Sequence, residues 1–406
     1  MSSTRWVIFR RTLLVLLIGG GMALAARKAR QPPPPVEPPP PVEAAVPALP
    51  TAAPLFPGTL PVSAQALPDG LASLSAQACN ACHGELHDRW QDSAHAQAWS
   101  SPTFRTALER VGETTGCTGC HLPLANQHAR LAAGYIEGDL ARPDLRPNPA
   151  WEPTLMSEGV SCAACHVRDG KVLTTRTEGQ APHPLATSAE LGSSEHCASC
   201  HQLTWPGADK PLYDTYGEWS RSAYAQAGVG CVDCHMPARA GSATGTRFAA
   251  VPDHGFPADP ARALSILVRT DAVEVTRGQP FVATITLQNT GAGHDLPTGS
   301  PFIGWRVVST LRDADGKSLV APGLLDLARD VSDAPPWTTL ADSRLVAGSE
   351  RSFEHRFTAD QKLKAGRGSL VVAVYRVSPA ERLDARWNPD KAGAPILVQR
   401  IPLSIL

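Results

Sequence analysis

Five copies of the pattern Cys-x-x-Cys-His constrain this chain more than any other feature, because together they contain all 10 of its cysteines. Two thiols three residues apart can add to the two vinyl groups of one porphyrin, and the histidine that follows can bind the iron. The pattern therefore predicts five covalently bound haem c groups. The attaching cysteines are Cys79, Cys82, Cys117, Cys120, Cys162, Cys165, Cys197, Cys200, Cys231 and Cys234, and the proximal ligands are His83, His121, His166, His201 and His235.

Disulfides and zinc are the other common uses of paired cysteines. Exported proteins form disulfides, and zinc ribbons use two cysteine pairs for each metal ion. Five pairs is an odd number, and neither use requires a histidine directly after every second cysteine. The haem interpretation is therefore favoured over both.

The N-terminal segment has the pattern of an export signal. Arg5, Arg10 and Arg11 precede an uncharged stretch, Thr12 to Ala26, which ends in small residues. A stretch of 15 residues is short for a spanning helix, which needs about 20. Residues 1–30 are thus either a cleaved signal peptide or a retained anchor in the inner membrane. Haem c attachment favours the same compartment, the periplasm.

A proline- and alanine-rich linker is predicted for residues 31–68, where two runs of four prolines favour extended chain. It is either a stalk that holds the haem domain away from a membrane or a disordered spacer. The net charge of −1 favours neither nucleic acid nor anionic lipid as a partner.

The haem domain is predicted to span residues 69–261. Roughly forty residues are available for each haem, too few to build five separate apolar pockets. The haems must form much of the core, and we expect folding to depend on them, as it depends on metal in small metallodomains.

An internal repeat lies within this domain. Trp90–Ala98 and Trp219–Ala227 share the pattern Trp-x-x-Ser-Ala-x-Ala-Gln-Ala, with Tyr224 in the place of His95. Each copy leads to a haem motif followed by proline, the second motif and the fifth. The sequence therefore predicts a duplicated unit of two haems with a helix between them.

These residues resemble the multihaem cytochromes c of the cytochrome c-554 type. The resemblance rests on Trp90-x-x-Ser93-x-His95-Ala96, on Gln202 after the fourth motif, and on the run from Tyr216 through Met236-Pro237. It implies a mostly α, loop-rich electron-transfer domain with closely stacked haems and mainly bis-histidine irons. His95 resembles the distal ligand that the family supplies to a haem other than its neighbour. Because this chain carries five motifs rather than four, the pairing of ligands and haems cannot be copied across.

Eight histidines remain as sources of distal ligands. Met156 is the one plausible methionine, so bis-histidine ligation is expected, with lower potentials than His/Met ligation gives. The distal candidates are His95, His183, His254 and His294, followed by His128 and His196. Each could instead be an ordinary surface or loop histidine. We expect His87 and His355 to face solvent.

Residues 262–406 contain no cysteine and show apolar runs separated by turn signals. About seven strands in ~145 residues predict an all-β, immunoglobulin-like sandwich. Its loop Asn289–Gly299 resembles one in similar multihaem cytochromes with an appended β domain. His294 in this loop either completes a haem iron across the domain interface or bonds to Asp295 or the backbone.

The chain is thus predicted to be an exported pentahaem cytochrome c that transfers electrons between redox partners, with a quinol-side or periplasmic donor. A second hypothesis is a nitrite or hydroxylamine reductase with one five-coordinate haem. Against it, nitrite reductases usually carry lysine in one attachment motif, and all five motifs here end in histidine. A third is a structural subunit that docks a partner or polymerises into a haem wire.

Overall fold

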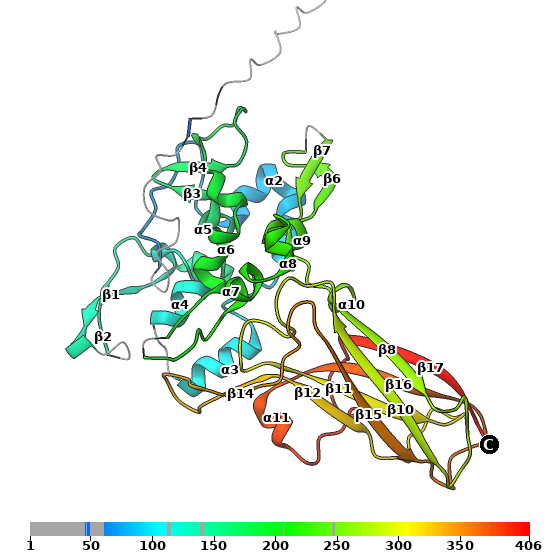
Figure 1. Cartoon of the computed structure of the whole chain (residues 1–406). Helices are drawn as coiled ribbons and strands as arrows, with labels where there is room; N and C mark the ends of the chain where they lie inside the picture. The colour runs from blue at the N-terminus through cyan, green and yellow to red at the C-terminus, as the bar shows by residue number, and fades with distance from the viewer. Residues whose placement is uncertain are drawn as a thin grey trace, which may run out of the picture. The chain divides into compact units, whose positions relative to one another are not determined.

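The computed structural model in Figure 1 describes residues 45, 47–48, 61–111, 115–138, 142–205, 207–245 and 248–406. The chain divides into two units, Met1–Ala44 and Ala45–Leu406, and the described residues all belong to the second unit. The predicted signal or anchor and most of the predicted linker lie outside the described residues. Within the described ranges, no helix combines the length and the apolar character needed to cross a membrane.

Each Cys-x-x-Cys-His motif forms a turn of helix. The helices that carry the motifs are α2 (Ala76–Gln91), α4 (Thr115–His121), α5 (Cys162–His166), α6 (Ser194–His201) and α9 (Cys231–His235). Residues three and four apart lie on one face of a helix, so a helical motif presents both thiols and the imidazole on the same side. The side chain of Ser75 caps α2, and that of Ser193 caps α6.

The rest of the haem region, residues 69–261, combines short helices with small sheets. The further helices are α3 (Pro102–Val111), η1 (Ala125–Gln127), η2 (Ile136–Gly138), η3 (Pro153–Glu158), η4 (Ala189–Gly192), α7 (Thr215–Ser220), α8 (Ala223–Gln226) and α10 (Pro260–Ala263). The strands are β1 (Arg130–Tyr135), β2 (Pro143–Pro147), β3 (Val167–Arg168), β4 (Lys171–Thr174), β5 (Leu185–Thr187), β6 (Ala238–Ser242) and β7 (Phe248–Pro252). They form two antiparallel pairs, β1–β2 and β6–β7, and one three-stranded sheet.

The prediction of a mostly α, loop-rich haem domain beside an all-β domain is wrong. The described part of the chain is 24% helix and 32% strand. A haem motif needs only one helical turn, and the segments between motifs are free to pair as strands. The sheet β3–β4–β5, which directly follows the third motif, is one example.

Residues 264–406, the β region, contain two larger sheets (Figure 1). The strands are β8 (Leu264–Thr270), β9 (Glu274–Val275), β10 (Pro280–Asn289), β11 (Gly304–Arg312), β12 (Gly323–Leu327), β13 (Arg329–Val331), β14 (Thr339–Asp342), β15 (Glu350–Thr358), β16 (Gly366–Val377) and β17 (Leu397–Ile405). One sheet has the order β15–β10–β8 and the other β12–β11–β16–β17–β9. The strands β13 and β14 pair separately, and α11 (Pro379–Leu383) follows β16.

The two sheets share one hydrophobic core. Side chains of β10 alternate between buried and partly exposed, as expected for a strand with one face on a core. Phe281, Ile285 and Leu287 from one sheet belong to the same buried cluster as Val307, Leu370 and Val372 from the other. Among the described residues this cluster has 22 members, whereas the buried cluster around α5 in the haem region has nine.

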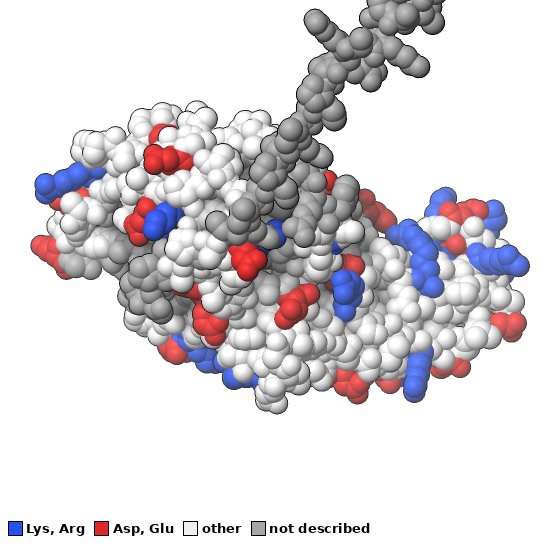
Figure 2. Space-filling model, turned by 90° about the horizontal axis from the view of Figure 1, so that it is seen from above, with Lys and Arg blue, Asp and Glu red and all other residues white. Residues whose placement is uncertain are grey.

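Charged side chains do not gather into a large patch of one sign on the face that Figure 2 draws. Lysine, arginine, aspartate and glutamate are scattered over it, in keeping with the net charge of −1.

Candidate functional site

Four of the five predicted proximal histidines donate a ring N–H to a backbone carbonyl. The Nδ1 atoms of His121, His166 and His235 lie 2.6, 2.8 and 2.9 Å from the carbonyl oxygens of Ala98, Leu173 and Pro257. His83 bonds the carbonyl of Ala243 in the same way. Metal-binding histidines usually donate their second nitrogen to such an acceptor, which fixes the tautomer and leaves Nε2 for the metal. These residues therefore fit the iron of a haem.

Three distal candidates face predicted proximal histidines at a uniform separation. The ring centroids are 6.2 Å apart for His95 and His201, 6.2 Å for His166 and His254, and 6.3 Å for His235 and His294. Two imidazoles on opposite sides of one iron have centroids roughly 6 Å apart, because each metal–nitrogen bond is about 2 Å long. The geometry fits one iron between the rings of each pair.

The same distal histidines are held neutral, which is the form that binds metal. Burial, followed by the charges of His201 and His235, lowers the pKa of His95 to about 4. Burial is also the main cause of the lowered pKa values of His254 and His294. Both donate Nδ1–H to a backbone carbonyl, that of Pro252 at 2.9 Å and that of Asp295 at 3.0 Å.

The other three distal candidates, His183, His196 and His128, differ from these in their contacts. His183 is an electrostatic neighbour of His83. Burial is the main cause of its lowered pKa, and the charge of His83 contributes less. His196 faces Glu190, and the charge of His196 contributes to lowering the pKa of His166. His128 uses Nε2 to donate to the carbonyl oxygen of Leu122, 2.7 Å away, so that nitrogen is engaged.

Two histidines that we expected to face solvent do not. The His87 side chain is only 10% exposed and packs on Trp90, with the ring centroids 5.6 Å apart. His355 is half-buried, and its Nδ1 lies 2.6 Å from the Ser309 hydroxyl. Trp90 lies one helical turn from His87 in the sequence, whereas Ser309 is distant from His355 in the sequence and meets it only in the fold.

The second motif differs from the third, fourth and fifth. Phe104 stacks on His121, with the ring centroids 3.6 Å apart and the planes 10° apart. Among the described residues, no histidine ring is in contact with His121. No local sequence signal marks this contact, because Phe104 lies on α3, outside every motif.

Cysteines of different motifs are close enough to perturb one another's pKa values. The pairs are Cys79 with Cys162, Cys120 with Cys200, and Cys197 with Cys231. These contacts join the first motif to the third, the second to the fourth, and the fourth to the fifth. All 10 cysteines are free of disulfides.

The repeat is arranged differently from the prediction. The Trp90 indole donates to the carbonyl of Val160, before the third motif, and the Trp219 indole donates to that of Val229, before the fifth; both distances are 2.9 Å. Gly159 and Gly228, which precede these valines, both adopt positive φ, 58° and 74°. The first motif is thus paired with the third rather than with the second. The shared Gly-Val-x-Cys could have indicated this pairing.

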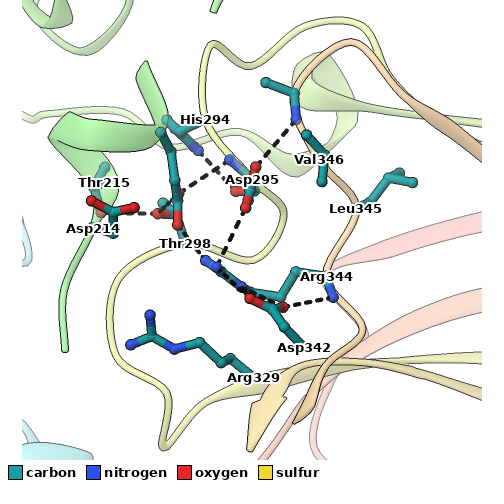
Figure 3. A network of polar contacts seen from close by, with 12 residues as sticks. Asp214, Thr215, His294, Asp295, Thr298, Arg329, Asp342, Arg344, Leu345 and Val346 are labelled. Carbon is teal, nitrogen blue, oxygen red and sulfur yellow. Dashed lines mark hydrogen bonds and ion pairs between the residues drawn. The ribbon is translucent and has the colours of Figure 1, made fainter. Parts of the chain in front are cut away.

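His294 lies in a loop held by polar contacts on both sides, drawn in Figure 3. Glu218 on α7 accepts hydrogen bonds from the Asp295 amide and the Thr298 hydroxyl and pairs with Arg344. Glu218 lies in the run from Tyr216 to Pro237 on which the family resemblance rests, whereas no sequence motif marks Arg344.

Comparisons with known proteins agree with this geometry. Residues 64–249 match the sequence model of the family described as cytochrome c552. A penta-heme cytochrome c552 from Thermochromatium tepidum is similar in fold: it is 20% identical, with a TM-score of 0.54 over 83% of this chain and 100% of that one. The protein is a multihaem c-type cytochrome. The narrower resemblance to the c-554 type stays a prediction.

Other structures are similar to this cytochrome only in part. A CARDB domain in complex with di-metal ions from Pyrococcus furiosus is 12% identical over 35% of this chain and 87% of its own, with a TM-score of 0.20. That similarity is too low to assign a fold. No match to a curated protein was found.

Proposed function

We propose that this cytochrome is an exported pentahaem protein that passes electrons along closely spaced, mainly bis-histidine haems between redox partners. The observation that carries the proposal is the set of three imidazole pairs, His95 with His201, His166 with His254, and His235 with His294, each separated as one iron requires. An iron with two imidazole ligands has no open position for substrate, so such haems serve electron transfer.

The contacts between motifs form two groups, the first with the third motif and the second and fifth with the fourth. Cys165 of the third motif is an electrostatic neighbour of Cys197 and Cys200 of the fourth, which links the two groups and supports a connected chain of haems. Cysteines of the fourth motif lie beside cysteines of the second and the fifth, and those of the first lie beside those of the third. Because each cysteine is the attachment point of a porphyrin, neighbouring thiols bring neighbouring porphyrin edges together. The protein would set the spacing and tune the potentials through axial ligands and burial.

A second function, a reductase with one five-coordinate haem, is favoured by the surroundings of His121. Among the described residues, Phe104 is the aromatic residue whose ring contacts this histidine. Within the described ranges, neither His83 nor His121 has a histidine ring at the separation seen for the other three proximal histidines, so the first or the second haem is the candidate for an open coordination position, where nitrite or hydroxylamine could bind. All five motifs end in histidine, so such an enzyme would lack the lysine that is usual in nitrite reductases.

Spectroscopy of the oxidised protein, purified from a host that attaches haem c, separates the two functions. Haem content first tests the number five by mass and by pyridine haemochrome. Low-spin signals from all haems would support electron transfer alone. A high-spin signal of one haem in five, combined with binding of carbon monoxide after reduction and turnover of nitrite or hydroxylamine, would support the reductase. A high-spin signal from most haems would contradict both proposals.

A further inference from the structure

The loop that carries His294 rests on the second copy of the repeat. The Tyr224 hydroxyl donates to the carbonyl of Thr290 at 2.7 Å, and the Thr298 hydroxyl lies 2.9 Å from that of Thr215. A Cβ atom on Gly293 would lie 3.2 Å from both Trp219 and Tyr224, so a larger residue there would press on α7 and α8. The loop therefore has a fitted contact surface on the haem region.

A buried carboxylate holds the centre of this contact. Glu218 is 5% exposed, and one of its oxygens accepts from the Asp295 amide at 3.2 Å and from the Thr298 hydroxyl at 2.5 Å. Its other oxygen lies 2.5 Å from the Arg344 guanidinium. An unpaired buried carboxylate is costly, so this geometry depends on the arginine.

Arg344 ties the far side of the loop to the same carboxylate. Its guanidinium lies 3.3 Å from Asp295 and 2.8 Å from Asp342. Figure 3 draws both contacts as dashed lines. The next residue, Leu345, exchanges two backbone hydrogen bonds with Leu296, of 2.9 and 3.0 Å. The loop is thus held between α7 and the segment that follows β14.

The two copies of the repeat differ at the positions that make these contacts. Trp219 and Ser222 have the same counterparts in the first copy, Trp90 and Ser93. Glu218 corresponds to the exposed Arg89, and Tyr224 corresponds to His95, which faces His201. The first copy supplies a distal histidine, whereas the second holds a loop that brings one.

We propose that α7 and α8 form a seat for the His294 loop, and that Glu218, Tyr224 and Arg344 are positioning residues that set His294 opposite His235. The inference rests on the proposed function, in which His294 is the distal ligand of the fifth haem. It goes further by assigning the ligand geometry to an ion pair between the haem region and the β region.

The test uses the full-length holoprotein and two readouts, spin quantitation by EPR and carbon monoxide binding after reduction. His294→Ala provides the reference and is expected to convert one haem in five to the high-spin, carbon monoxide-binding form. If it changes neither readout, His294 is not a ligand, and the proposed ligation fails together with this inference.

Arg344→Gln and Gly293→Val test the seat itself. Both are expected to show part or all of the high-spin signal of His294→Ala at an unchanged ratio of haem to protein, and Arg344→Lys should restore most of the low-spin signal. Arg356→Gln removes an exposed arginine, and Gly393→Val adds a side chain where no atom lies within 4 Å; both controls should resemble the wild type.

Wild-type spectra from Arg344→Gln and Gly293→Val, alongside a positive His294→Ala, would overturn the seat and leave the proposed function intact. Should Arg344→Gln fail to fold, the spectra of Gly293→Val and Thr298→Val test the seat in its place, since neither variant changes the charge of the cluster.

Discussion

His95 is the residue whose chemistry is most sharply defined, because its ring lies 6.2 Å from that of His201 and packs edge-on against Phe256 at 4.2 Å. Methionine is flexible enough to occupy this space and offers a thioether to the iron. In His95→Met, one of the five redox transitions should therefore move to higher potential, by a fraction of the roughly 0.8 V range that axial ligands control. Spectroelectrochemical titration measures the shift.

The control for this variant is His355→Met in the β region, where the histidine contacts Ser309 and not a haem motif. Its titration should match that of the wild type. An unchanged titration for His95→Met would remove His95 from the set of ligands.

Asp313 is a second residue with a defined energetic role. Its carboxylate accepts hydrogen bonds from the amides of Asp315, Lys317 and Lys364, and the bond from Lys364 is the main cause of its lowered pKa. Asp313→Ala should reduce the free energy of unfolding of the β region by about 2–3 kcal/mol at neutral pH. Urea unfolding followed by hydrogen exchange of peptides from β11 measures this loss.

The pH dependence of that loss has a definite sign. A carboxylate whose pKa is lower in the folded state stabilises the fold at neutral pH, and this contribution disappears as the pH falls below about 4. The difference between Asp313→Ala and the wild type should therefore narrow in acid, whereas the exposed Asp333→Ala should show little difference at either pH. A constant difference would contradict the role of the ionised carboxylate.

At the scale of elements, α2 and α7, which carry Trp90 and Trp219, pack on the segments that precede the third and fifth motifs. Trp90→Phe removes the hydrogen bond to Val160, and Trp219→Phe removes the equivalent bond to Val229. Each loss should cost about 1 kcal/mol and weaken the packing of one pair of motifs. Hydrogen exchange should therefore speed up in residues 159–166 for Trp90→Phe and in residues 228–235 for Trp219→Phe.

Each variant serves as the matched control of the other, because the bonds are of equal length and the helices belong to the same repeat. Faster exchange at residues 115–121 in Trp90→Phe, without a change at 159–166, would instead support the pairing of the first motif with the second that the sequence predicted.

The elements that could be predicted from the sequence are those with local signals. The apolar runs predicted as strands in residues 262–406 all contribute to strands, because alternation and turn residues act over a few positions. These runs begin at Leu264, Phe281, Gly304, Phe353, Leu370 and Ile396. The motifs specified their own helical turns for the same reason. The short strands β9 and β12–β14 were not predicted, since pairing with neighbouring strands rather than their own sequence pattern defines them.

The pairing of distant elements could be predicted only in part. His95, His254 and His294 were identified as distal candidates because few histidines remained, but no local pattern specified which proximal histidine each one faces. The Phe104 contact with His121 and the Glu218–Arg344 ion pair join residues from separate elements. Such contacts depend on the tertiary fold, and a single sequence carries no local record of them.

At the scale of the whole molecule, the two regions have very different means of stabilisation. The β region has a hydrophobic cluster of 22 buried residues, including Phe281, Phe357 and Leu311. The nine-residue cluster of the haem region includes three alanines, Ala163, Ala164 and Ala186, and so buries much less apolar surface. The haem region therefore depends on its cofactors for a core, and the β region does not.

Protein produced without haem attachment tests this difference. We expect residues 62–257 to exchange amide hydrogens at close to the rate of an unfolded chain, because the haems that would fill their core cannot be held. Residues 304–312 and 366–377, in the centre of the larger sheet, should stay protected as in the holoprotein. Loss of protection in both regions would mean that the β region needs the haem region to fold, and protection in both would mean that the polypeptide alone supplies a sufficient core around the motifs.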